Sequence, residues 1–324
     1  MKAIRISRLG GPEVMEYVDY ALPPPGPGEV RVRNAVIGLN FGESYFRSGL
    51  YGVPRLPSGM GSEAVGVVEA LGQGVVGFSL GDRVAYAEGV LGAYAEAANV
   101  PADRLVRPPE GLPDEMVAAA LSKGLTAQML IRQTFRVEKG QTILLHAAAG
   151  GVGVILAQWA RSLGARVIGA TSSAEKAAFA RQHGCSEVVD VTRPGWVEAV
   201  MALTHGAGVP VVFDSNGRDT FLGSLDCLAP LGTMVSYGNA SGPAPAIEPL
   251  ELMRRGSLRL TRPYLGHYLQ AGEGLAAMAD ELFEVLAAGK IRLPINQRFR
   301  LSQALEAHER MGARGTTGLS VMIP

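Results

Sequence analysis

The stretch TILLHAAAGGVGVILAQWARSLGARVIGATSS (142–173) decides the fold that this sequence predicts. It opens with an apolar run at 142–147 and passes through the glycine-rich segment HAAAGGVG (146–153). Apolar residues at helical spacing then continue to about residue 163, and a second apolar run follows at 165–170. A strand, a tight turn, a helix and a second strand in this order predict the first unit of a parallel sheet with a crossover helix.

The same alternation continues toward the C-terminus. Further strands are predicted at 187–191, 209–215, 233–238 and 258–263, and further helices at 173–183, 196–205 and 220–229. Strands of about five apolar residues separated by helices indicate a parallel sheet that is covered on both faces. Right-handed crossovers then give a doubly wound α/β domain of the Rossmann kind.

The N-terminal part has a different pattern. Short predicted strands, bounded by Gly and Pro, lie at 29–38, 64–72, 82–87 and 92–100. This pattern is typical of a mostly antiparallel, irregular β domain. A helix is predicted at 273–289, and the terminal strand GLSVMIP (318–324) is expected to return to the first domain and make it discontinuous.

Composition excludes several classes of protein. The chain has 324 residues, 47% hydrophobic and 19% charged, which favours about two packed domains. Its formal net charge is zero and it lacks a basic run, so binding to nucleic acid is not expected. Cys185 and Cys227 do not have the spacing of a zinc or redox site. No apolar stretch predicts a membrane span or a signal peptide, so a cytoplasmic protein is expected.

The glycine-rich segment is the strongest functional signal. Gly150, Gly151 and Gly153, with Val152 between them, would let the backbone approach a pyrophosphate at the free N–H groups of the helix start. Ala147 stands where the usual dinucleotide fingerprint has its first glycine. The competing interpretation is a glycine-rich helix entry without a ligand.

The end of the second strand indicates which dinucleotide is bound. An NAD enzyme would place Asp or Glu there against the ribose hydroxyls, but residues 169–173 are Gly-Ala-Thr-Ser-Ser. Ser172 and Lys176 instead suit the 2′-phosphate of NADPH. Ser172 with Glu175 also matches a capping box, a role that is compatible with phosphate binding.

These motifs resemble the quinone oxidoreductases, the zinc-free branch of the medium-chain dehydrogenase/reductase superfamily that includes the zeta-crystallins. The likeness also covers residues 38–52, 56–68, 122–127, 214–220, 235–242, 256–263 and the terminal strand. The resemblance implies a GroES-like catalytic domain at 1–123 and 265–324, a Rossmann NADPH-binding domain at 124–264, and a homodimer. We expect the dimer to join along the edge strand near 258–263.

The resemblance also implies roles for individual residues. It places Asn40, Tyr45 and Tyr51 near the nicotinamide and the substrate, and Thr126 near the nicotinamide ribose. Asn216, Tyr237, Gly238 and Ser241 would line the cofactor groove, with Arg262 and Arg314 at charged contacts. Two departures are present: Val191 replaces a tyrosine that several relatives have beside the adenine phosphate, and Gln128 and Met129 replace aromatic residues. Arg193 is the side chain that could compensate for Val191.

The resemblance bears on metal chemistry as well. Asn40, Ser62 and Glu63 stand at the positions where zinc alcohol dehydrogenases of the same superfamily have their ligands. Since a catalytic zinc needs three N, S or O ligands, no metal is expected. A carbonyl without a Lewis acid is hard to reduce, so the substrate should already be electrophilic. Asn40 and Tyr45 could donate to the developing oxyanion, and Tyr45 or water could supply the proton.

Three functions therefore remain open. The first is an NADPH-dependent quinone reductase that works by hydride or one-electron transfer. The second is an NADPH-dependent enone or alkenal reductase, which would differ only in the shape of its substrate site. The third is a structural or RNA-binding protein of the zeta-crystallin kind, against which the neutral charge and the intact glycine-rich segment argue.

Overall fold

The computed structural model describes residues 1–53, 55–88, 91–272 and 274–324, which form two compact units. The first unit contains Met1–Leu125, Leu275–Ala287 and Leu293–Pro324, and the second contains Thr126–Gly274 and Ala288–Arg292. These bounds differ from the domain limits expected from the sequence mainly at 265–274, which fall in the second unit. The chain passes from the first unit to the second within helix α2 (Asp114–Gln128).

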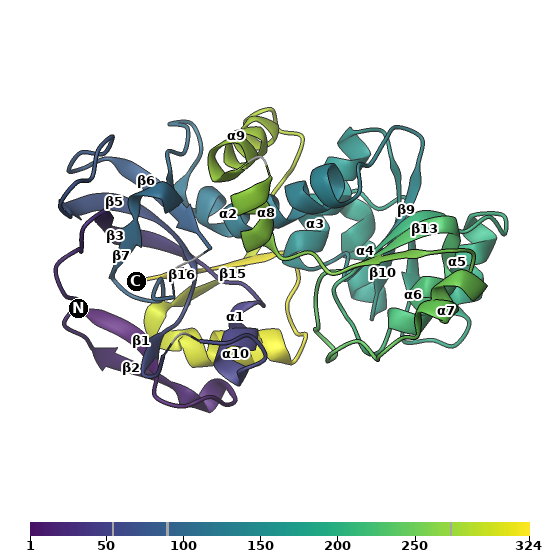
Figure 1. Cartoon of the computed structure of the whole chain (residues 1–324), viewed down its shortest axis with the longest axis horizontal. Helices are drawn as coiled ribbons and strands as arrows, with labels where there is room; N and C mark the ends of the chain where they lie inside the picture. Colours follow the sequence, from purple (N-terminus) through teal and green to yellow (C-terminus); the bar gives the residue numbers. More distant parts are fainter. Residues whose placement is uncertain (54, 89–90, 273) are drawn as a thin grey trace. The chain divides into compact units, whose positions relative to one another are not determined.

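The second unit is built on a six-stranded parallel sheet with the strand order β11-β10-β9-β12-β13-β14 (Figure 1). Its strands are β9 (Thr142–His146), β10 (Arg166–Thr171), β11 (Glu187–Asp190), β12 (Val209–Asp214), β13 (Leu228–Ser236) and β14 (Arg259–Thr261). The predicted doubly wound parallel sheet is confirmed, with β14 at its edge. Strands such as β9 and β12 are apolar at successive positions because both faces of this sheet are buried.

Helices connect these strands in the chain. They are α3 (Gly151–Ser162), α4 (Ala174–Gln182), α5 (Trp196–Leu203), α6 (Phe221–Asp226) and α7 (Pro249–Arg254). The π-helical turn η3 (Met129–Thr134) precedes the first strand, and α8 (Leu265–Ala271) follows the last. Side chains of the helices and strands share one buried core, which includes Leu144, Ile168, Val212, Phe221 and Met234.

The first unit is mostly antiparallel β-structure, as predicted. Its larger sheet has the order β15-β16-β3-β5-β6-β8, with β7 also paired to β3, and a smaller sheet has the order β2-β1-β4. The strands are β1 (Lys2–Ile6), β2 (Met15–Asp19), β3 (Glu29–Gly38), β4 (Ser58–Gly59), β5 (Glu63–Leu71), β6 (Arg83–Ala87), β7 (Ala97–Pro101), β8 (Leu105–Val106), β15 (Ile295–Arg300) and β16 (Leu319–Ile323).

The C-terminal strand returns to this sheet, as the sequence predicted. Val321 and Met322 of β16 pair with Gly38 and Ile37 of β3, and Figure 1 shows the yellow C-terminal strands among the strands of the N-terminal part. The helical segments of this unit, with α2, are η1 (Pro12–Val14), α1 (Glu43–Ser48), η2 (Ala102–Arg104), α9 (Gly274–Ala287), η4 (Leu301–Gln303) and α10 (Ala304–Gly312). Residue 273, with which the last long helix was predicted to begin, lies outside the described residues.

Both cysteines are buried, and burial raises the pKa of each thiol to about 12. Within the described ranges, none of the helices is both long enough and apolar enough to cross a membrane.

Candidate functional site

The glycine-rich turn of the second unit has the geometry that a phosphate loop requires. β9 ends at His146, and Ala147 follows with a φ of 49°, a left-handed conformation at the position where the fingerprint usually has glycine. Gly150 is the extended N-cap of α3, and its N–H donates to the Ala147 carbonyl at 2.8 Å. A Cβ on Gly153 would lie 2.3 Å from that same carbonyl oxygen, so only glycine lets α3 start this close to the turn.

Gly151 and Val152 begin helix α3, directly after this turn. The first N–H groups of a helix have no partner within the helix, and they carry the positive end of its dipole. The predicted residues Gly150, Gly151, Val152 and Gly153 are therefore together at a helix start that can hold a diphosphate.

The end of β10 carries no carboxylate, but its cap differs from the expected one. Ser173 is the N-cap of α4, with extended backbone angles, and its hydroxyl oxygen accepts from the N–H of Lys176 at 3.2 Å. The expected cap by Ser172 is wrong, because α4 begins at Ala174 and Ser172 lies one residue too early. Ser172 and Lys176 are both half-buried and lie at the start of this helix.

The loops after β12 and β13 bring four predicted residues together. The Ser241 hydroxyl donates to the carbonyl oxygen of Asn216 at 2.8 Å, and the Tyr237 N–H donates to the Asp214 carbonyl at 2.8 Å. A Cβ on Gly238 would lie 2.4 Å from the carbonyl oxygen of Ser215, so the two loops are in close backbone contact.

Three further predicted residues lie outside these two loops. Arg262, just after β14, donates from Nη1 to the Ser236 carbonyl at 3.0 Å, at the end of β13. Thr126 is half-buried in α2. Arg314 follows α10 in the first unit and is exposed, with a φ of 55°. Arg262 thus joins the carboxyl edge of the sheet, whereas Arg314 belongs to the other compact unit.

Asn40, Tyr45 and Tyr51 gather around α1 in the first unit. The rings of Tyr45 and Tyr51 have centroids 5.0 Å apart, and Phe41 and Phe46 each contact one of them edge-on at 5.6 Å. The backbone N–H of Tyr51 also donates to the carbonyl of Tyr45 at 2.9 Å, which holds the loop against the helix. The four rings are all half-buried, so this group offers both an aromatic surface and phenol hydroxyls.

Asn40 is held by two buried carboxyl groups. Its Nδ2 donates to Glu63 Oε2 at 2.8 Å and to Glu43 Oε1 at 3.2 Å, and the Ser62 hydroxyl donates to the same Glu43 oxygen at 3.1 Å. Both N–H groups of the amide are thereby engaged. Donation from Asn40 to a developing oxyanion, as expected from the sequence, would require one of these bonds to break.

The same cluster contains one ammonium group. Lys123 Nζ lies 3.8 Å from Glu63 Oε2, and its side chain is only 8% exposed. The backbone N–H of Ser122 donates to Glu63 Oε1 at 2.6 Å, while its hydroxyl donates to Glu88 at 3.2 Å. Ser122 thus connects Glu63, which lies near Lys123, to the half-buried Glu88.

Burial dominates the protonation of these acids. It raises the pKa of Glu43 to about 7, even though the hydrogen bond from Asn40 favours the charged form. It also raises the pKa values of Glu63 and Glu88, in Glu63 against the attraction of the Lys123 ammonium. Burial thus shifts the pKa values of all three acids in the same direction, toward the protonated form.

The sequence reasoning missed the residues that connect these groups. Lys123 lies in the motif SKGLTA (122–127), and Asp214 begins the motif DSNGRDT (214–220), but neither was singled out. The run Asp-Ser-Asn-Gly at 214–217 is a turn signal that could have marked Asp214. Glu43 has one local partner, Asn40 three residues earlier, but its contact with Ser62 joins residues that are 19 positions apart.

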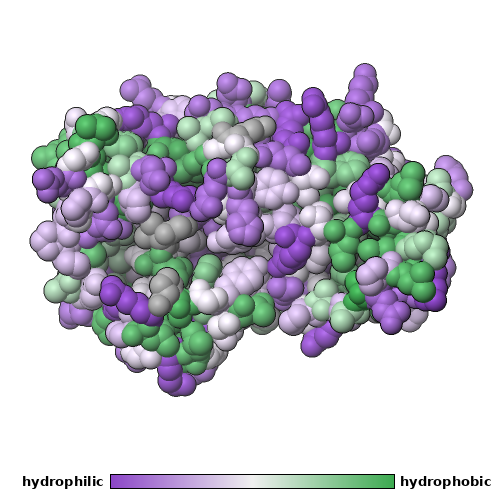
Figure 2. Space-filling view, viewed as in Figure 1, coloured by the Kyte–Doolittle hydropathy of each residue, from purple (hydrophilic) through white to green (hydrophobic). Residues whose placement is uncertain are grey.

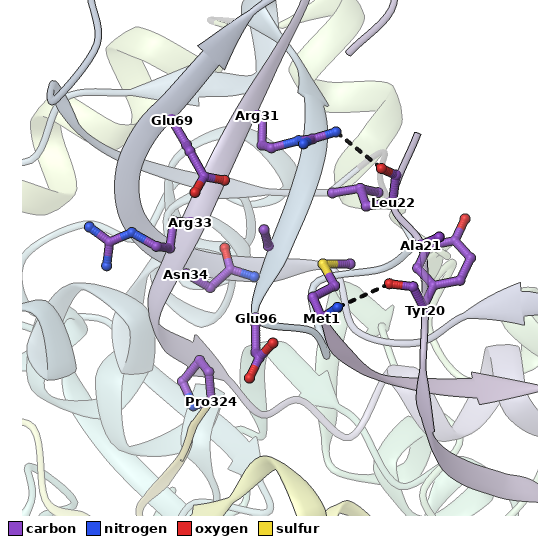
Figure 3. A pocket seen from close by; sticks show the side chains of 11 residues that line it. Met1, Tyr20, Ala21, Leu22, Arg31, Arg33, Asn34, Glu69, Glu96 and Pro324 are labelled. Atoms are coloured by element: carbon purple, nitrogen blue, oxygen red, sulfur yellow. Dashed lines mark hydrogen bonds between the residues drawn. The ribbon is translucent and has the colours of Figure 1, made fainter. Parts of the chain in front are cut away.

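Two other observations concern the candidate site. Among the residues that the structure describes, no three His, Cys, Asp or Glu side chains are grouped so that they could hold a metal ion. A surface pocket of the first unit lies near both chain ends and includes Arg31, Arg33 and Glu96 (Figure 3). Arg31 and the Met1 amine donate to backbone carbonyls there, and none of the predicted site residues lines this pocket.

Comparison with known proteins now identifies the family. Residues 26–110 match the alcohol dehydrogenase GroES-like domain, and residues 151–280 match the zinc-binding dehydrogenase domain. The chain is 53% identical over 323 residues to a quinone oxidoreductase of Pseudomonas aeruginosa, with 100% of this chain and 99% of that protein covered. The chain belongs to the quinone oxidoreductase family.

Other relatives also match over nearly their whole length, at lower sequence identity. The crystal structure of the Escherichia coli quinone oxidoreductase complexed with NADPH superposes with a TM-score of 0.97 at 42% identity, and each chain is covered completely. A 2-haloacrylate reductase of Burkholderia is 42% identical, with 98% of both chains covered. The GroES-like and Rossmann domains of the medium-chain dehydrogenase/reductase superfamily, expected from the sequence, are confirmed.

Proposed function

We propose that this protein is an NADPH-dependent quinone reductase. The observation that carries the proposal is the turn between β9 and α3, where Ala147 and Gly153 bring a helix start into the position of a phosphate loop. The relatives named quinone oxidoreductase, one of them solved with NADPH, support both the cofactor and the reaction.

NADPH rather than NADH is the proposed cofactor because of the end of β10. The strand ends at Thr171 and Ser172 follows, so the chain at the end of β10 itself has no carboxylate to repel a 2′-phosphate or to bind a free ribose hydroxyl. Lys176, in the first turn of α4, supplies a positive charge near the helix start. Asn216, Tyr237, Gly238, Ser241 and Arg262 are proposed to line the rest of the cofactor groove, and Thr126 and Arg314 remain proposals from the resemblance.

Replacement of Lys176 with alanine tests this assignment. The variant should bind NADPH about tenfold more weakly, the effect of losing one charge-assisted hydrogen bond. NADH, which has no 2′-phosphate, should bind equally to both proteins. Fluorescence titration with each cofactor measures the effect, and Lys290→Ala, at an exposed lysine, is the control. An equal loss for NADPH and NADH would contradict the role of Lys176.

The group of rings at α1 is the proposed place for the quinone. Flat conjugated rings stack favourably on Tyr and Phe, and Tyr45 and Tyr51 present hydroxyls beside that surface. We propose that Tyr45 donates a hydrogen bond to the reduced oxygen, that Tyr51 orients the ring, and that Asn40 shapes the site. No metal is required, because a quinone gains a delocalised anion when it accepts a hydride.

Steady-state assays test the reaction and its independence of metal. NADPH oxidation should proceed with 1,4-benzoquinone and 1,4-naphthoquinone, and it should be unchanged after dialysis against EDTA. Aliphatic ketones should react poorly, because no Lewis acid contributes its several kcal/mol at the carbonyl. Loss of quinone reduction after chelation, with recovery on addition of zinc, would disprove the metal-free proposal.

A second candidate function is the reduction of an activated alkene. The relative named 2-haloacrylate reductase supports it, since it is as similar to this chain as the Escherichia coli quinone oxidoreductase. The assay distinguishes the two: kcat/KM should be higher for quinones than for 2-chloroacrylate or an enone under the same conditions.

We also propose that the protein acts in the cytoplasm and that it is a homodimer. The two copies are proposed to pair along the edge strand β14. β14 is at the end of the parallel sheet, and Leu260 on it is 38% exposed, with Leu231 and Met253 more exposed still. Figure 2 shows apolar side chains on the surface of the second unit where Figure 1 labels α6 and α7. An unpaired edge with apolar side chains can pair with its copy about a twofold axis.

Light scattering should therefore give about twice the 34.0 kDa mass of one chain. Leu260→Lys, which places a charge on the edge strand, should give the mass of a monomer, whereas Leu305→Lys, at an exposed leucine of α10, should leave the dimer intact. A monomeric wild-type protein at micromolar concentration would rule out the dimer.

A further inference from the structure

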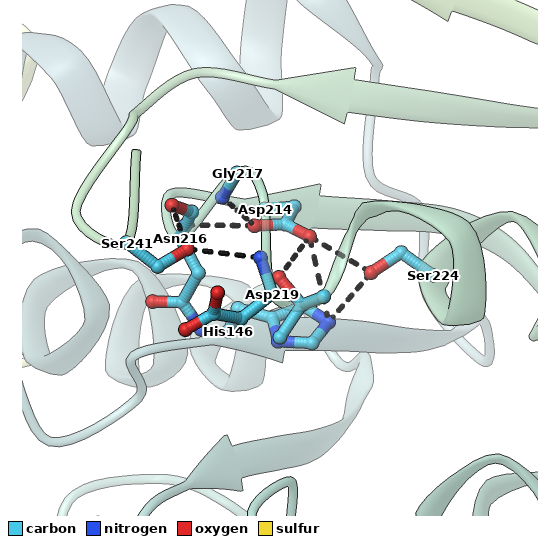
Figure 4. Close-up of polar contacts among 8 residues, drawn as sticks. His146, Asp214, Asn216, Gly217, Asp219, Ser224 and Ser241 are labelled. Atoms are coloured by element: carbon cyan, nitrogen blue, oxygen red, sulfur yellow. Dashed lines mark hydrogen bonds and ion pairs between the residues drawn. The ribbon is translucent and has the colours of Figure 1, made fainter. Parts of the chain in front are cut away.

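A buried carboxylate, Asp214, lies at the carboxyl end of β12 and accepts four hydrogen bonds (Figure 4). Its Oδ1 accepts from the backbone N–H groups of Asn216 at 2.7 Å and Gly217 at 3.1 Å. Its Oδ2 accepts from the hydroxyls of Thr220 at 2.7 Å and Ser224 at 2.8 Å. One side chain thus fixes both the start and the end of the loop that follows β12.

This loop is joined to the loop after β13. The carbonyl oxygen of Asn216 accepts from both the N–H and the hydroxyl of Ser241, each at 2.8 Å, and the Ser241 hydroxyl accepts from the N–H of Asp219 at 3.0 Å. A Cβ on Gly217 would lie 2.3 Å from the carbonyl oxygen of Gly242. The two loops therefore form one hydrogen-bonded layer. Asp214 stabilises this layer through its hydrogen bonds to the loop after β12.

The Ser224 hydroxyl extends the network to the glycine-rich turn. It donates its only proton to Asp214, so the contact with His146 Nε2 at 2.9 Å must be a bond that the imidazole donates. Burial lowers the pKa of His146, which is consistent with a neutral ring protonated at Nε2. His146 is the last residue of β9, and the phosphate loop begins at the next residue.

The order of the strands determines which part of the dinucleotide this network faces. β9 lies between β10 and β12, so the pyrophosphate loop has β10 on one side and β12 with β13 on the other. The proposed 2′-phosphate site is at the end of β10. Because a dinucleotide extends in both directions from its pyrophosphate, the half that carries the nicotinamide must extend over the ends of β12 and β13.

We propose that Asp214 is a positioning residue for the nicotinamide riboside half of NADPH. It acts through the loops after β12 and β13, which it holds in place before the ligand binds, and it does not contact the cofactor itself. The inference rests on the proposed binding of NADPH. It adds a division of the site: the end of β10 recognises the adenosine phosphate, and the Asp214 network organises the other half.

Binding of two ligands to Asp214→Ala tests this division. NADPH contains both halves, whereas 2′,5′-ADP lacks the nicotinamide riboside. The variant should bind NADPH about 100-fold more weakly, because displacement of binding groups by about 1 Å can have an effect of this size. Its affinity for 2′,5′-ADP should stay within about twofold of the wild type, since the β10 side is untouched. Isothermal titration gives both dissociation constants.

Two further variants distinguish a loss of loop positioning from a general loss of ligand binding. Asp214→Asn keeps an oxygen for the N–H groups of Asn216 and Gly217, so it should recover most of the affinity for NADPH. Lys176→Ala should show a different result, with an equal loss of affinity for 2′,5′-ADP and for NADPH. If Asp214→Ala does not fold, the double variant Thr220→Val, Ser224→Ala can be used, because it removes both donors to Oδ2. This variant should bind NADPH about tenfold more weakly and should bind 2′,5′-ADP as the wild type does.

Equal losses for NADPH and 2′,5′-ADP in a folded Asp214 variant would overturn the inference. An unchanged affinity for NADPH would overturn it as well. A wild-type protein that binds 2′,5′-ADP and NADPH equally well would show that the second half makes no contact with these loops. If the wild type binds neither ligand, the proposed function itself fails.

Discussion

Replacement of Gly153 with alanine is expected to weaken NADPH binding by about 100-fold, the effect of moving binding groups by about 1 Å. The added Cβ would lie 2.3 Å from the Ala147 carbonyl oxygen and 2.9 Å from the Ala148 Cα. Both are backbone atoms, so no side chain can rotate to relieve the contact, and the start of α3 must move away from the turn. The N–H groups that would hold the pyrophosphate move with it.

The dissociation constant for NADPH, from fluorescence titration, measures this effect, and thermal unfolding by circular dichroism verifies that the variant is folded. Gly312→Ala is the matched control, because it also adds a methyl group to a helical glycine but meets no atom within 4 Å. If Gly153→Ala binds NADPH as tightly as Gly312→Ala does, the turn before α3 is not the phosphate loop.

A second large effect is expected in the pH dependence of stability. Burial raises the pKa of Glu43 from 4.5 to about 7 in the folded protein. Between these values the folded state keeps a proton that the unfolded state has lost, so the free energy of unfolding falls as pH rises from about 4.5 to about 7. At about 1.4 kcal/mol per pH unit, the Glu43 contribution to this fall is about 3 kcal/mol.

Glu43→Gln should remove that contribution. The amide cannot ionise, and its oxygen can still accept from Asn40 and Ser62 as Glu43 Oε1 does. Urea denaturation at pH 5 and pH 8.5 should show that the wild type loses about 3 kcal/mol more than Glu43→Gln across this range. Glu284→Gln, at an exposed glutamate of α9, should retain the wild-type pH dependence. A Glu43→Gln variant with the same pH dependence as the wild type would show that Glu43 is ionised in the fold.

Much of the fold was predictable because its signals are local. Buried parallel strands are apolar at successive positions, as at 142–146 and 209–214, and both were predicted within one residue. The terminal strand was also placed correctly, but on the strength of the family resemblance, since nothing in residues 319–323 indicates a partner. The error at Ser172 has a local cause: capping depends on backbone angles, and Ser173 rather than Ser172 adopts them at the start of α4.

The sequence by itself determined the parallel sheet, the glycine-rich turn, the uncharged end of β10 and the cofactor class that these features favour. Only the tertiary structure decided how the polar side chains pair. Asn40 donates a hydrogen bond to Glu63, and Lys123 forms an ion pair with the same carboxylate. His146 is connected to Asp214 by hydrogen bonds through Ser224. These partners are far apart in the chain and come together because strands and helices pack against one another in each unit, which brings the side chains to buried positions where an unpaired polar group is costly. The spacing of these residues in the sequence does not predict the pairs, because the pairs arise from how the elements pack in the tertiary structure.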